Sequence, residues 1–533
     1  MTTTTTPYRP GQHAGRDGFP QVLRAEWTKL RTVRGWVIAA FAAAAATALA
    51  PVALSATATN PAESCAGGRC QAEAHNIATG PGGAAVTDTF YFVHQALTGN
   101  GSITARVSGP RGLGAPAGQP ATEPWAKAGL IVKASTTPGS AYAAIMNTGG
   151  HGVAMQYDYA HSTAGAGGAA ARWLRLARSG DTVTGYYSAD GRHWAKAGTA
   201  TLAGLPATVQ AGLFVASPDF EFDTQSFGGG DQGIDIGTRA AATFGGVSLR
   251  GGWAGHAWHG DRVGTGTGAP APARCGQHGC VINPGQLEPP GSVRQAGGTF
   301  AVTGSGDIAP YVPVVDPVEA MFYGTLFGVI AVIALGAVFI TAEYRRGLIR
   351  TTLAASPRRA RVLAAKAIVI GLVTFAAGLA GAAVAFTVTQ RRLSSLGWRP
   401  PVWHGWSLTS ATGVQVVVGT AALLAVTALL ALAAGTILRR SAGAVTAVMG
   451  VVIVPLILAV VLPTGPADLL MRLTPAAAFG LQQTTVRYPQ VITGCTPYHG
   501  CYPLAPWPGF AVMCAWAVAA LVTAAVLLRR RDA

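Results

Sequence analysis

The sequence predicts a polytopic α-helical membrane protein with six transmembrane helices and one inserted all-β sandwich domain. Half of the 533 residues are hydrophobic and only 11% are charged, whereas soluble domains carry about 25% charged residues. Six long stretches contain no Asp, Glu, Lys or Arg. Between the first two of these stretches, segment 57–318 consists largely of short β-type runs and Gly-rich turns, which indicates a separate domain.

The six uncharged stretches are long enough to cross a bilayer as helices. A hydrocarbon core requires about 20 apolar residues in a helix, and backbone groups in lipid must be hydrogen-bonded within their own segment. We therefore expect transmembrane helices at 36–56, 319–342, 366–388, 412–438, 442–463 and 508–528. Segment 1–35 precedes the first span, and an outer loop at 464–507 separates the last two.

The distribution of Lys and Arg predicts the orientation of the spans in a plasma membrane. The segments 1–35, 343–366, 439–440 and 529–533 together hold 18 Lys and Arg and have a net charge of +14. Because positive loops stay in the cytoplasm, both termini are expected inside and the β-rich insert outside. The insert is nearly neutral, so the net charge of +16 does not indicate a nucleic-acid-binding protein.

The first span has a second interpretation. A basic stretch followed by an Ala-rich run and the small residues of ALAPVALSATA is also typical of a secretory signal peptide. Pro51 directly after Ala50 disfavours cleavage there, and segment 1–35 is long for the start of such a signal. We expect the span to be retained, with cleavage as the alternative.

The sequence of the insert predicts a β-sandwich over about residues 83–250. Runs such as SITARVSG, GVAMQYDY and TVTGYYS are separated by tight-turn signals such as Ser179-Gly180-Asp181. Many short strands at this spacing are typical of a sandwich or a jelly roll. The flanks 60–85 and 251–315 are rich in Gly, Pro and Ala and predict linkers, although part of the second flank can add strands.

The hairpin WLRLARSGDTVTGYYSADGRHW, residues 173–194, resembles the concanavalin-like lectin and laminin-G jelly-roll superfamily. The resemblance implies a cell-envelope glycan as a partner, with Trp173 and Trp194 as residues that can stack on sugar rings; packing in the core is the alternative role for both. Glycanases of this superfamily carry E-x-D-x-x-E. Here Glu221 and Asp223 are followed by Ser226, which argues against hydrolysis.

The insert and the last outer loop contain six of the seven cysteines. An even number of cysteines on the oxidising side of a membrane suggests disulfides, and the spacing is wider than the C-x-x-C of zinc sites. Cys495–Cys501 is the favoured pair, whereas the other four can pair locally or across the two ends of the insert. A weak calcium site in the acidic stretch 219–235 is a further alternative, but we predict no metal. The six cysteines are Cys65, Cys70, Cys275, Cys280, Cys495 and Cys501.

The loop after the second span contains a glutamate and apolar residues among its arginines, and membrane topology alone does not require them. Residues 343–359 read EYRRGLIRTTLAASPRR. A stop-transfer loop accounts for the arginines but not for the glutamate or the apolar residues among them. We therefore predict a short amphipathic docking element that projects from the membrane. Its residues are Glu343, Arg345, Arg346, Leu348, Ile349, Arg350, Pro357 and Arg358.

A second amphipathic helix is predicted before the first span. Leu23, Trp27 and Leu30 recur at helical spacing and share one face, while Arg and Lys occupy the rest. Such a helix lies in the headgroup region of a bilayer, with its cations toward anionic lipid.

Three of these segments together resemble the permease subunit of an ABC-2-type transporter: LRAEWTKLRTVRG at 23–35, EYRRGLIRTTLAASPRR at 343–359 and RLTPAAAFGLQQ at 472–483. The resemblance covers residues 20–56 and 316–533. It implies that 343–359 contact an ABC-type ATPase subunit and that the outer loop caps the transport pathway. The loop between the first two spans is usually short in that family, and here it is replaced by the insert.

The predicted function is therefore that of one membrane half of an ATP-driven exporter. The chain contains no G-x-x-x-x-G-K-[ST] phosphate-binding loop, so we expect no ATP hydrolysis by it and no cofactor. The resemblance also implies a second permease chain, most simply an identical one, because transporters of that family are assembled from two membrane halves. A membrane-bound sensor of an envelope glycan is the alternative, and a tethered glycanase is a weaker third.

Overall fold

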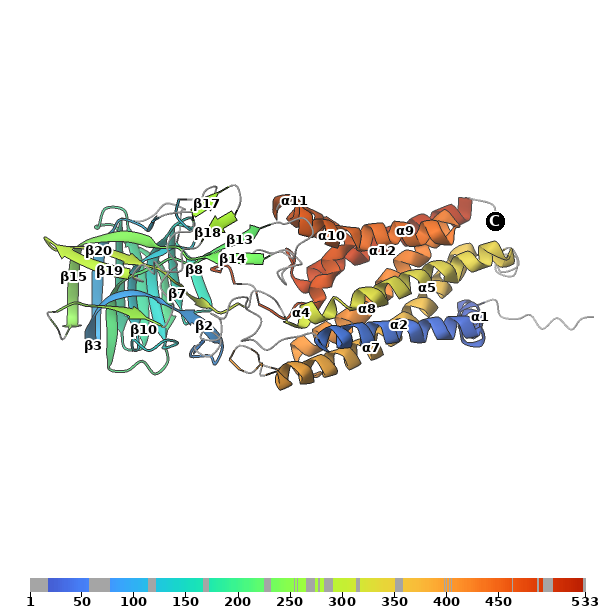
Figure 1. Ribbon diagram of the computed structural model, residues 1–533, viewed down its shortest axis with the longest axis horizontal. Helices are drawn as coiled ribbons and strands as arrows, with labels where there is room; N and C mark the ends of the chain where they lie inside the picture. Colours follow the sequence, from blue (N-terminus) through green and yellow to red (C-terminus); the bar gives the residue numbers. More distant parts are fainter. Residues whose placement is uncertain are drawn as a thin grey trace, which may run out of the picture.

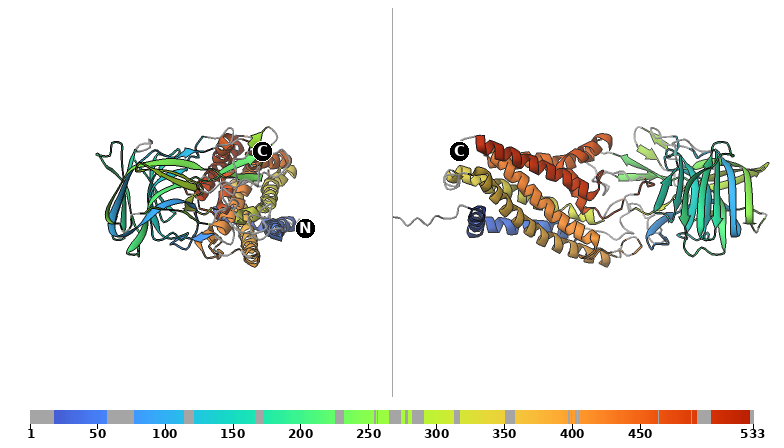
Figure 2. Two further views of the ribbon diagram at one scale, coloured as in Figure 1. Left: turned by 60° about the vertical axis from the view of Figure 1, so that its left-hand side comes forward. Right: turned by 180° about the vertical axis from the view of Figure 1, so that it is seen from behind.

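The computed structural model contains a helix bundle and a β-domain arranged end to end (Figures 1 and 2). It describes residues 18–56, 77–113, 121–165, 172–224, 232–253, 255, 257–264, 274–276, 279–281, 291–312, 317–349, 358–396, 398, 400–401, 403, 405–462, 464–486, 488–491 and 502–530.

In the described residues, six helices are long and apolar enough to cross a membrane, which confirms the predicted fold class. The helices are α1 (Phe19–Thr32), α2 (Arg34–Ala56), α4 (Pro317–Phe322), α5 (Thr325–Arg345), α7 (Arg359–Ser395), α8 (Ala411–Leu438), α9 (Ser441–Val452), α10 (Val454–Val461), α11 (Thr464–Leu473), the 3₁₀ helix η1 (Pro475–Gln482) and α12 (Pro506–Arg530).

Three of the predicted spans differ in extent or continuity from the helices of the structure. The stretch expected at 319–342 is divided into α4 and α5, with Gly324 as the N-cap of α5. The stretch at 442–463 is divided at Ile453, just before Pro455, whose missing backbone N–H cannot continue a helical hydrogen-bond ladder. Helix α7 is longer than predicted at both ends, so Arg391 and Arg392 lie in helix rather than in a loop.

Small residues allow the helices to pack closely. A Cβ on Gly328 of α5 would lie 2.2 Å from the Thr47 hydroxyl of α2, and a Cβ on Gly381 of α7 would lie 2.7 Å from the Ala44 carbonyl. Close backbone approach at small residues is the usual way in which transmembrane helices associate. Helix α2 is therefore held between α5 and α7.

The outer loop contributes a buried element to the bundle. All eight residues of η1 are buried. The Gln482 amide nitrogen donates to the hydroxyls of Thr325 on α5 (2.9 Å) and Thr420 on α8 (3.3 Å). These hydrogen bonds tie η1, which packs mainly against α12 and α8, to α8 and to the start of α5. The start of α5, beside α4, lies at the end of the bundle nearer the β-domain (Figure 1).

The β-domain extends beyond the predicted limit at residue 250. Its strands are β1 (Ala78–Thr79), β2 (Ala85–Asp88), β3 (Phe90–Val107), β4 (Arg111–Gly112), β5 (Lys127–Lys133), β6 (Tyr142–Thr148), β7 (Val153–Tyr157), β8 (His161–Ala164), β9 (Trp173–Ser179), β10 (Thr182–Ser188), β11 (Ala195–Thr201), β12 (Thr208–Ala216), β13 (Phe220–Thr224), β14 (Gln232–Ile236), β15 (Ala240–Trp253), β16 (His259–Val263), β17 (Arg274–Gly276), β18 (Gly279–Val281), β19 (Gly291–Ala296), β20 (Thr299–Gly304) and β21 (Ile308–Pro310).

One large antiparallel sheet forms most of the domain, with the strand order β11-β10-β9-β3-β12-β5-β6-β7-β8. The sheet folds back on itself, because residues of β9 and β10 share a hydrophobic core with residues of β5, β6 and β7. Strand β20 pairs with β15 and β19, so part of the flank predicted to be a linker belongs to the sheet. The Gly-rich composition of that flank conceals its strands.

A small sheet joins the two ends of the insert. Strand β2 near its beginning pairs with β21 near its end, with Asp88 opposite Ile308. Two buried lysines at the two ends of β5 hold this small sheet. Lys133 lies 2.6 Å from Asp88, and Lys127 pairs with Asp307. Because isolated buried charges are costly, these ion pairs fix both ends of the insert to the large sheet.

A third acid, Glu123, lies near Lys127 and is only 2% exposed. Burial raises the pKa of Glu123 to about 7, and the charge of Asp307 adds to the effect, against the backbone N–H groups and Lys127, which lower it. The folded domain thus binds a proton on Glu123 at pH values where the unfolded chain has already lost it.

We predict that the β-domain becomes less stable as the pH rises from about 5 to about 8. The folded pKa lies above the unfolded value, so stability is lost across the window between them, by at most about 3 kcal/mol. Thermal unfolding of a fragment spanning 77–312 as a function of pH measures this. The Glu123→Gln variant is the control and should flatten the pH dependence; an equal slope in both proteins would contradict the assignment.

Candidate functional site

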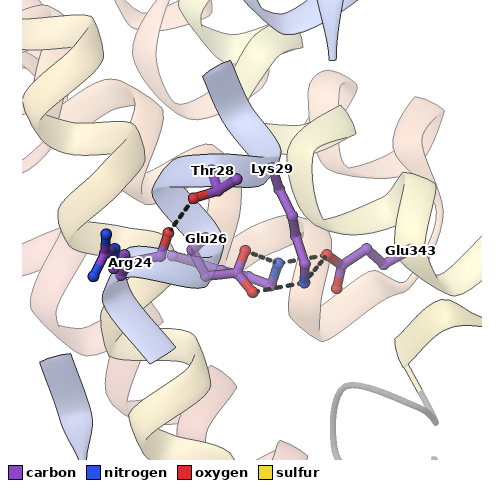
Figure 3. Close-up of polar contacts among 6 residues, drawn as sticks. Arg24, Glu26, Thr28, Lys29 and Glu343 are labelled. Atoms are coloured by element: carbon purple, nitrogen blue, oxygen red, sulfur yellow. Dashed lines mark hydrogen bonds and ion pairs between the residues drawn. The ribbon is translucent and has the colours of Figure 1, made fainter. Parts of the chain in front are cut away.

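Four charged side chains meet at the end of the bundle that lies away from the β-domain (Figure 3). Glu26 and Lys29 come from α1, Glu343 from the last turn of α5, and Lys366 from the second turn of α7. We refer to these four residues as the charge cluster. The three helices that supply these residues are far apart in sequence. The predicted docking segment, 343–359, starts at Glu343 and ends shortly before Lys366.

The two lysines of the charge cluster bridge the two glutamates. The Lys366 ammonium lies 2.7 Å from Glu26 Oε2 and 2.6 Å from Glu343 Oε1. Lys29 lies 2.8 Å from Glu26 Oε1 and 3.3 Å from Glu343 Oε1. Lys366 also lies 5.1 Å from the centre of the Phe339 ring, a favourable cation–π contact.

Burial differs among the members of the charge cluster. The side chains of Lys366 and Glu26 are 1% and 2% exposed, that of Glu343 is 13% exposed, and that of Lys29 is 43% exposed. Removing one partner of a buried ion pair typically costs about 3–5 kcal/mol, because an unpaired charge remains. Lys366 is therefore the residue on which the joint between α1, α5 and α7 depends.

The environment of Lys29 favours its charged form. Burial lowers its pKa, but the hydrogen bonds to Glu26 and Glu343 and the negative charges of both outweigh this effect, so the pKa is raised. Lys29 therefore remains an ammonium group that closes the cluster on its exposed side.

Two further contacts extend the joint to the remaining helices. The guanidinium of Arg439, at the turn between α8 and α9, lies 5.4 Å from the centre of the Tyr344 ring. Arg359, at the start of α7, donates to the Leu528 carbonyl near the end of α12, at 2.9 Å. The ends of all the long helices are thus connected around the loop that follows α5.

The predicted docking residues differ in their exposure to solvent. Arg345, Arg346, Leu348 and Arg358 are exposed, as a docking surface requires, whereas Ile349 is buried. Glu343 faces the charge cluster, and Arg350 and Pro357 lie outside the described residues. The chain does not continue as one helix, because Gly347, at φ 69°, follows the C-cap Arg346.

The predicted interfacial helix is present as α1. Leu30 is buried and Leu23 packs against the core of the bundle, whereas Trp27 is exposed. The three residues therefore do not share one environment. The inner face of α1 carries Glu26 as well as Leu30, and Trp27 lies on the exposed side.

Only Glu343 of the charge cluster is among the site residues predicted from the sequence; Glu26, Lys29 and Lys366 are not, and Glu26 and Lys366 are its two most buried members. Glu26 lies among the cations of α1, so its charge suggests an exposed position. Lys366 precedes the apolar run that begins at Ala367, so it resembles an ordinary flanking cation. A usable signal is that both positions fall on the inward face of their helices, since a charge there needs a partner.

The residues predicted to contact glycans have other partners. Trp173 lies against Gly191 and Gly246, where an added Cβ would lie 3.1 Å from its ring. The Arg175 guanidinium covers one face of Trp194, 4.0 Å from the ring centre. The side chains of Glu221 and Asp223 are outside the described residues, and no group of His, Cys, Asp or Glu suited to a metal occurs in the described part of the chain.

The predicted disulfides are described only in part. Cys65, Cys70, Cys495 and Cys501 lie outside the described residues. Cys275 and Cys280 lie on β17 and β18, where the two residues are direct partners in an antiparallel pair.

Comparisons with solved structures find partial likenesses, of which two are described below. A crystal structure of a functionally unknown protein from Saccharomyces cerevisiae is 16% identical, with 30% of this chain and 74% of that chain covered and a TM-score of 0.20. The peptidase SCP-B, a member of the Eqolisin family in complex with the tripeptide Ala-Ile-His, is 11% identical, with 40% and 98% covered and a TM-score of 0.22. Neither likeness bears on function.

Among curated proteins no match is found. Residues 208–533 match the family model described as ABC-2 family transporter protein. The match covers more than half of the chain, beginning in β12 and including five of the six candidate spans. The chain therefore belongs to the ABC-2 transporter family and is a membrane component of such a transporter.

Proposed function

We propose that this chain is one membrane half of an ATP-driven exporter and that the charge cluster transmits the movement of a separate ATPase subunit to the helices. The observation that carries the proposal is the position of Glu343 and Lys366. They lie at the two ends of the arginine-rich loop and form a 2.6 Å ion pair with each other. Any force on the loop is therefore received by α5 and α7 together.

The charge cluster would also transmit the movement of the ATPase subunit to α1. Glu26 on α1 binds the same Lys366 ammonium, so α1 cannot move away from α7 without separating buried charges. Because α1 leads directly into α2, which packs between α5 and α7, displacement of the loop would rotate three spans as one unit. Packed interfaces of this kind favour discrete rearrangements over gradual bending.

The loop itself carries the features that recognise an acidic groove on a partner. Arg345, Arg346 and Arg358 are exposed at its ends, beside the exposed Leu348. Arginine forms bidentate pairs with carboxylates and contributes strongly to protein interfaces. We infer that the partner is an ABC-type ATPase and that two permease chains assemble, because transport requires a pathway between two membrane halves.

The proposed orientation follows the same charges. The arginine-rich ends of the helices would face the cytoplasm, where ATP is available, and the β-domain would face outward across a plasma membrane. A glycan contact of a lectin-like insert would have to displace Arg175 from Trp194, so we do not favour the sensor alternative.

We predict that Lys366→Met lowers the stability of the membrane domain by about 3–5 kcal/mol, because it removes the buried partner of Glu26 and Glu343 and leaves them only the more exposed Lys29. Thermal unfolding in detergent micelles measures the change. Arg24→Met on the exposed side of α1 is the matched control and should have little effect. An unchanged midpoint for Lys366→Met would show that the cluster does not hold the helices together.

We further predict that a neutralised cluster, Glu26→Gln with Glu343→Gln and Lys366→Met, recovers most of this stability but not transport coupling. Replacing all buried charges removes the unpaired group but also removes the rigid joint. ATP hydrolysis by the reconstituted complex should continue without net substrate movement. Coupled transport at the wild-type rate would argue against transmission through these residues.

Reversing the exposed charges tests the docking surface. The double variant Arg346→Glu and Arg358→Glu should abolish co-purification of the ATPase subunit, because both ends of the loop would then repel an acidic groove. Arg392→Glu is the control, because it lies near the opposite end of α7 and is also exposed. Retained co-purification in the double variant would exclude this loop as the ATPase contact.

A further inference from the structure

The β-domain is tied to the outer loop of the bundle by a buried hydrogen bond. Gln490, in the segment that follows η1, is 0% exposed. Its amide nitrogen donates to the backbone carbonyl of Tyr159 at 3.0 Å. Tyr159 lies between β7 and β8. Figure 1 shows these two strands on the side of the β-domain that faces the helices.

The backbone at this contact is held in an unfavourable conformation. Asp158 and Tyr159 have φ values of 44° and 63°, in the left-handed region that residues with a Cβ rarely adopt. Strain of this kind persists only where the surroundings enforce it, and it is concentrated at sites with a function.

The enforcing group is the ion pair that fixes the beginning of the insert. The Tyr159 hydroxyl lies 2.7 Å from Asp88 Oδ2 and 3.1 Å from the Lys133 ammonium. Asp88 Oδ2 also accepts from the Gly139 backbone N–H at 2.7 Å. The strained turn, the end of β2 and the end of β5 are thus one buried unit.

The other side of the contact is fixed just as firmly. Gln490 lies eight residues after the end of η1, and η1 is hydrogen-bonded to α5 and α8 through Gln482. The adjacent Gln483 carbonyl accepts from Gln415 of α8 at 3.1 Å. Movement of η1 out of the bundle would therefore displace Gln490 from Tyr159.

We propose that the β-domain is a restraint on the outer end of the bundle, which keeps η1 in its buried position against α12 and α8 until the Gln490–Tyr159 contact breaks. The insert is then a structural part of this end of the bundle rather than a flexibly tethered module. Its attachment agrees with this role, because only six residues separate the end of β21 from the start of α4. The inference does not depend on the identity of the ATPase partner.

Hydrogen exchange of the full chain in lipid nanodiscs tests the proposal. In Gln490→Ala, backbone exchange in peptides covering 475–491 should become about fivefold faster, as expected for the loss of one hydrogen bond of about 1 kcal/mol. The exposed Gln295→Ala on β19 is the control and should leave these peptides unchanged.

A second variant separates a restraint from a local contact. Tyr159→Phe leaves the accepting carbonyl in place but removes the hydroxyl that holds the strained turn. If the insert restrains η1, exchange at 475–482 should rise in this variant too, although the changed atom lies in the β-domain. Unchanged exchange at 475–482 in both variants would overturn the proposal, and so would acceleration confined to 488–491.

Discussion

A lysine buried at the base of a helix bundle must be paired, and the pairing of Lys366 determines how this end of the molecule is built. Its ammonium lies within 2.7 Å of carboxylates from two other helices, and no single helix supplies both. The cost of separating such charges is several kcal/mol, so α1, α5 and α7 keep their relative positions at this end. The arginine-rich loop connects Glu343 to the helix that carries Lys366. A displacement of this loop would therefore act on α5 and α7 together.

The β-domain uses the same chemistry near its junction with the helix bundle. Lys127 and Lys133 are buried at the two ends of one strand, and each pairs with an aspartate near one end of the insert. A domain inserted between two spans is thereby fixed to its own attachment points. The contact between Gln490 and Tyr159 then connects this rigid domain to η1. Buried polar groups thus define both ends of the transporter, with mostly apolar helices between them.

Most of the fold could be predicted from the sequence, because uncharged runs and β-type runs are properties of local composition. The charge cluster could not. Glu26 and Lys366 have ordinary flanking sequences, and only the packing of α1 against α7 brings them together. Glu343 was recognised as unusual, but its partner lies beyond the loop and on another helix. The strands after residue 250 were concealed by glycine and proline, whose frequency indicates linkers unless pairing partners such as β15 are known.

The central claim is that the charge cluster and its loop face the ATP-containing compartment, while the β-domain faces the other side of the membrane. Single cysteines at exposed positions, Arg346→Cys in the loop and Ser248→Cys in the insert, report this directly when intact cells are treated with a membrane-impermeant maleimide. With the β-domain outside and the loop inside, we expect labelling at position 248 in intact cells and at position 346 only after permeabilisation. Labelling of position 346 in intact cells, with position 248 protected, would contradict it.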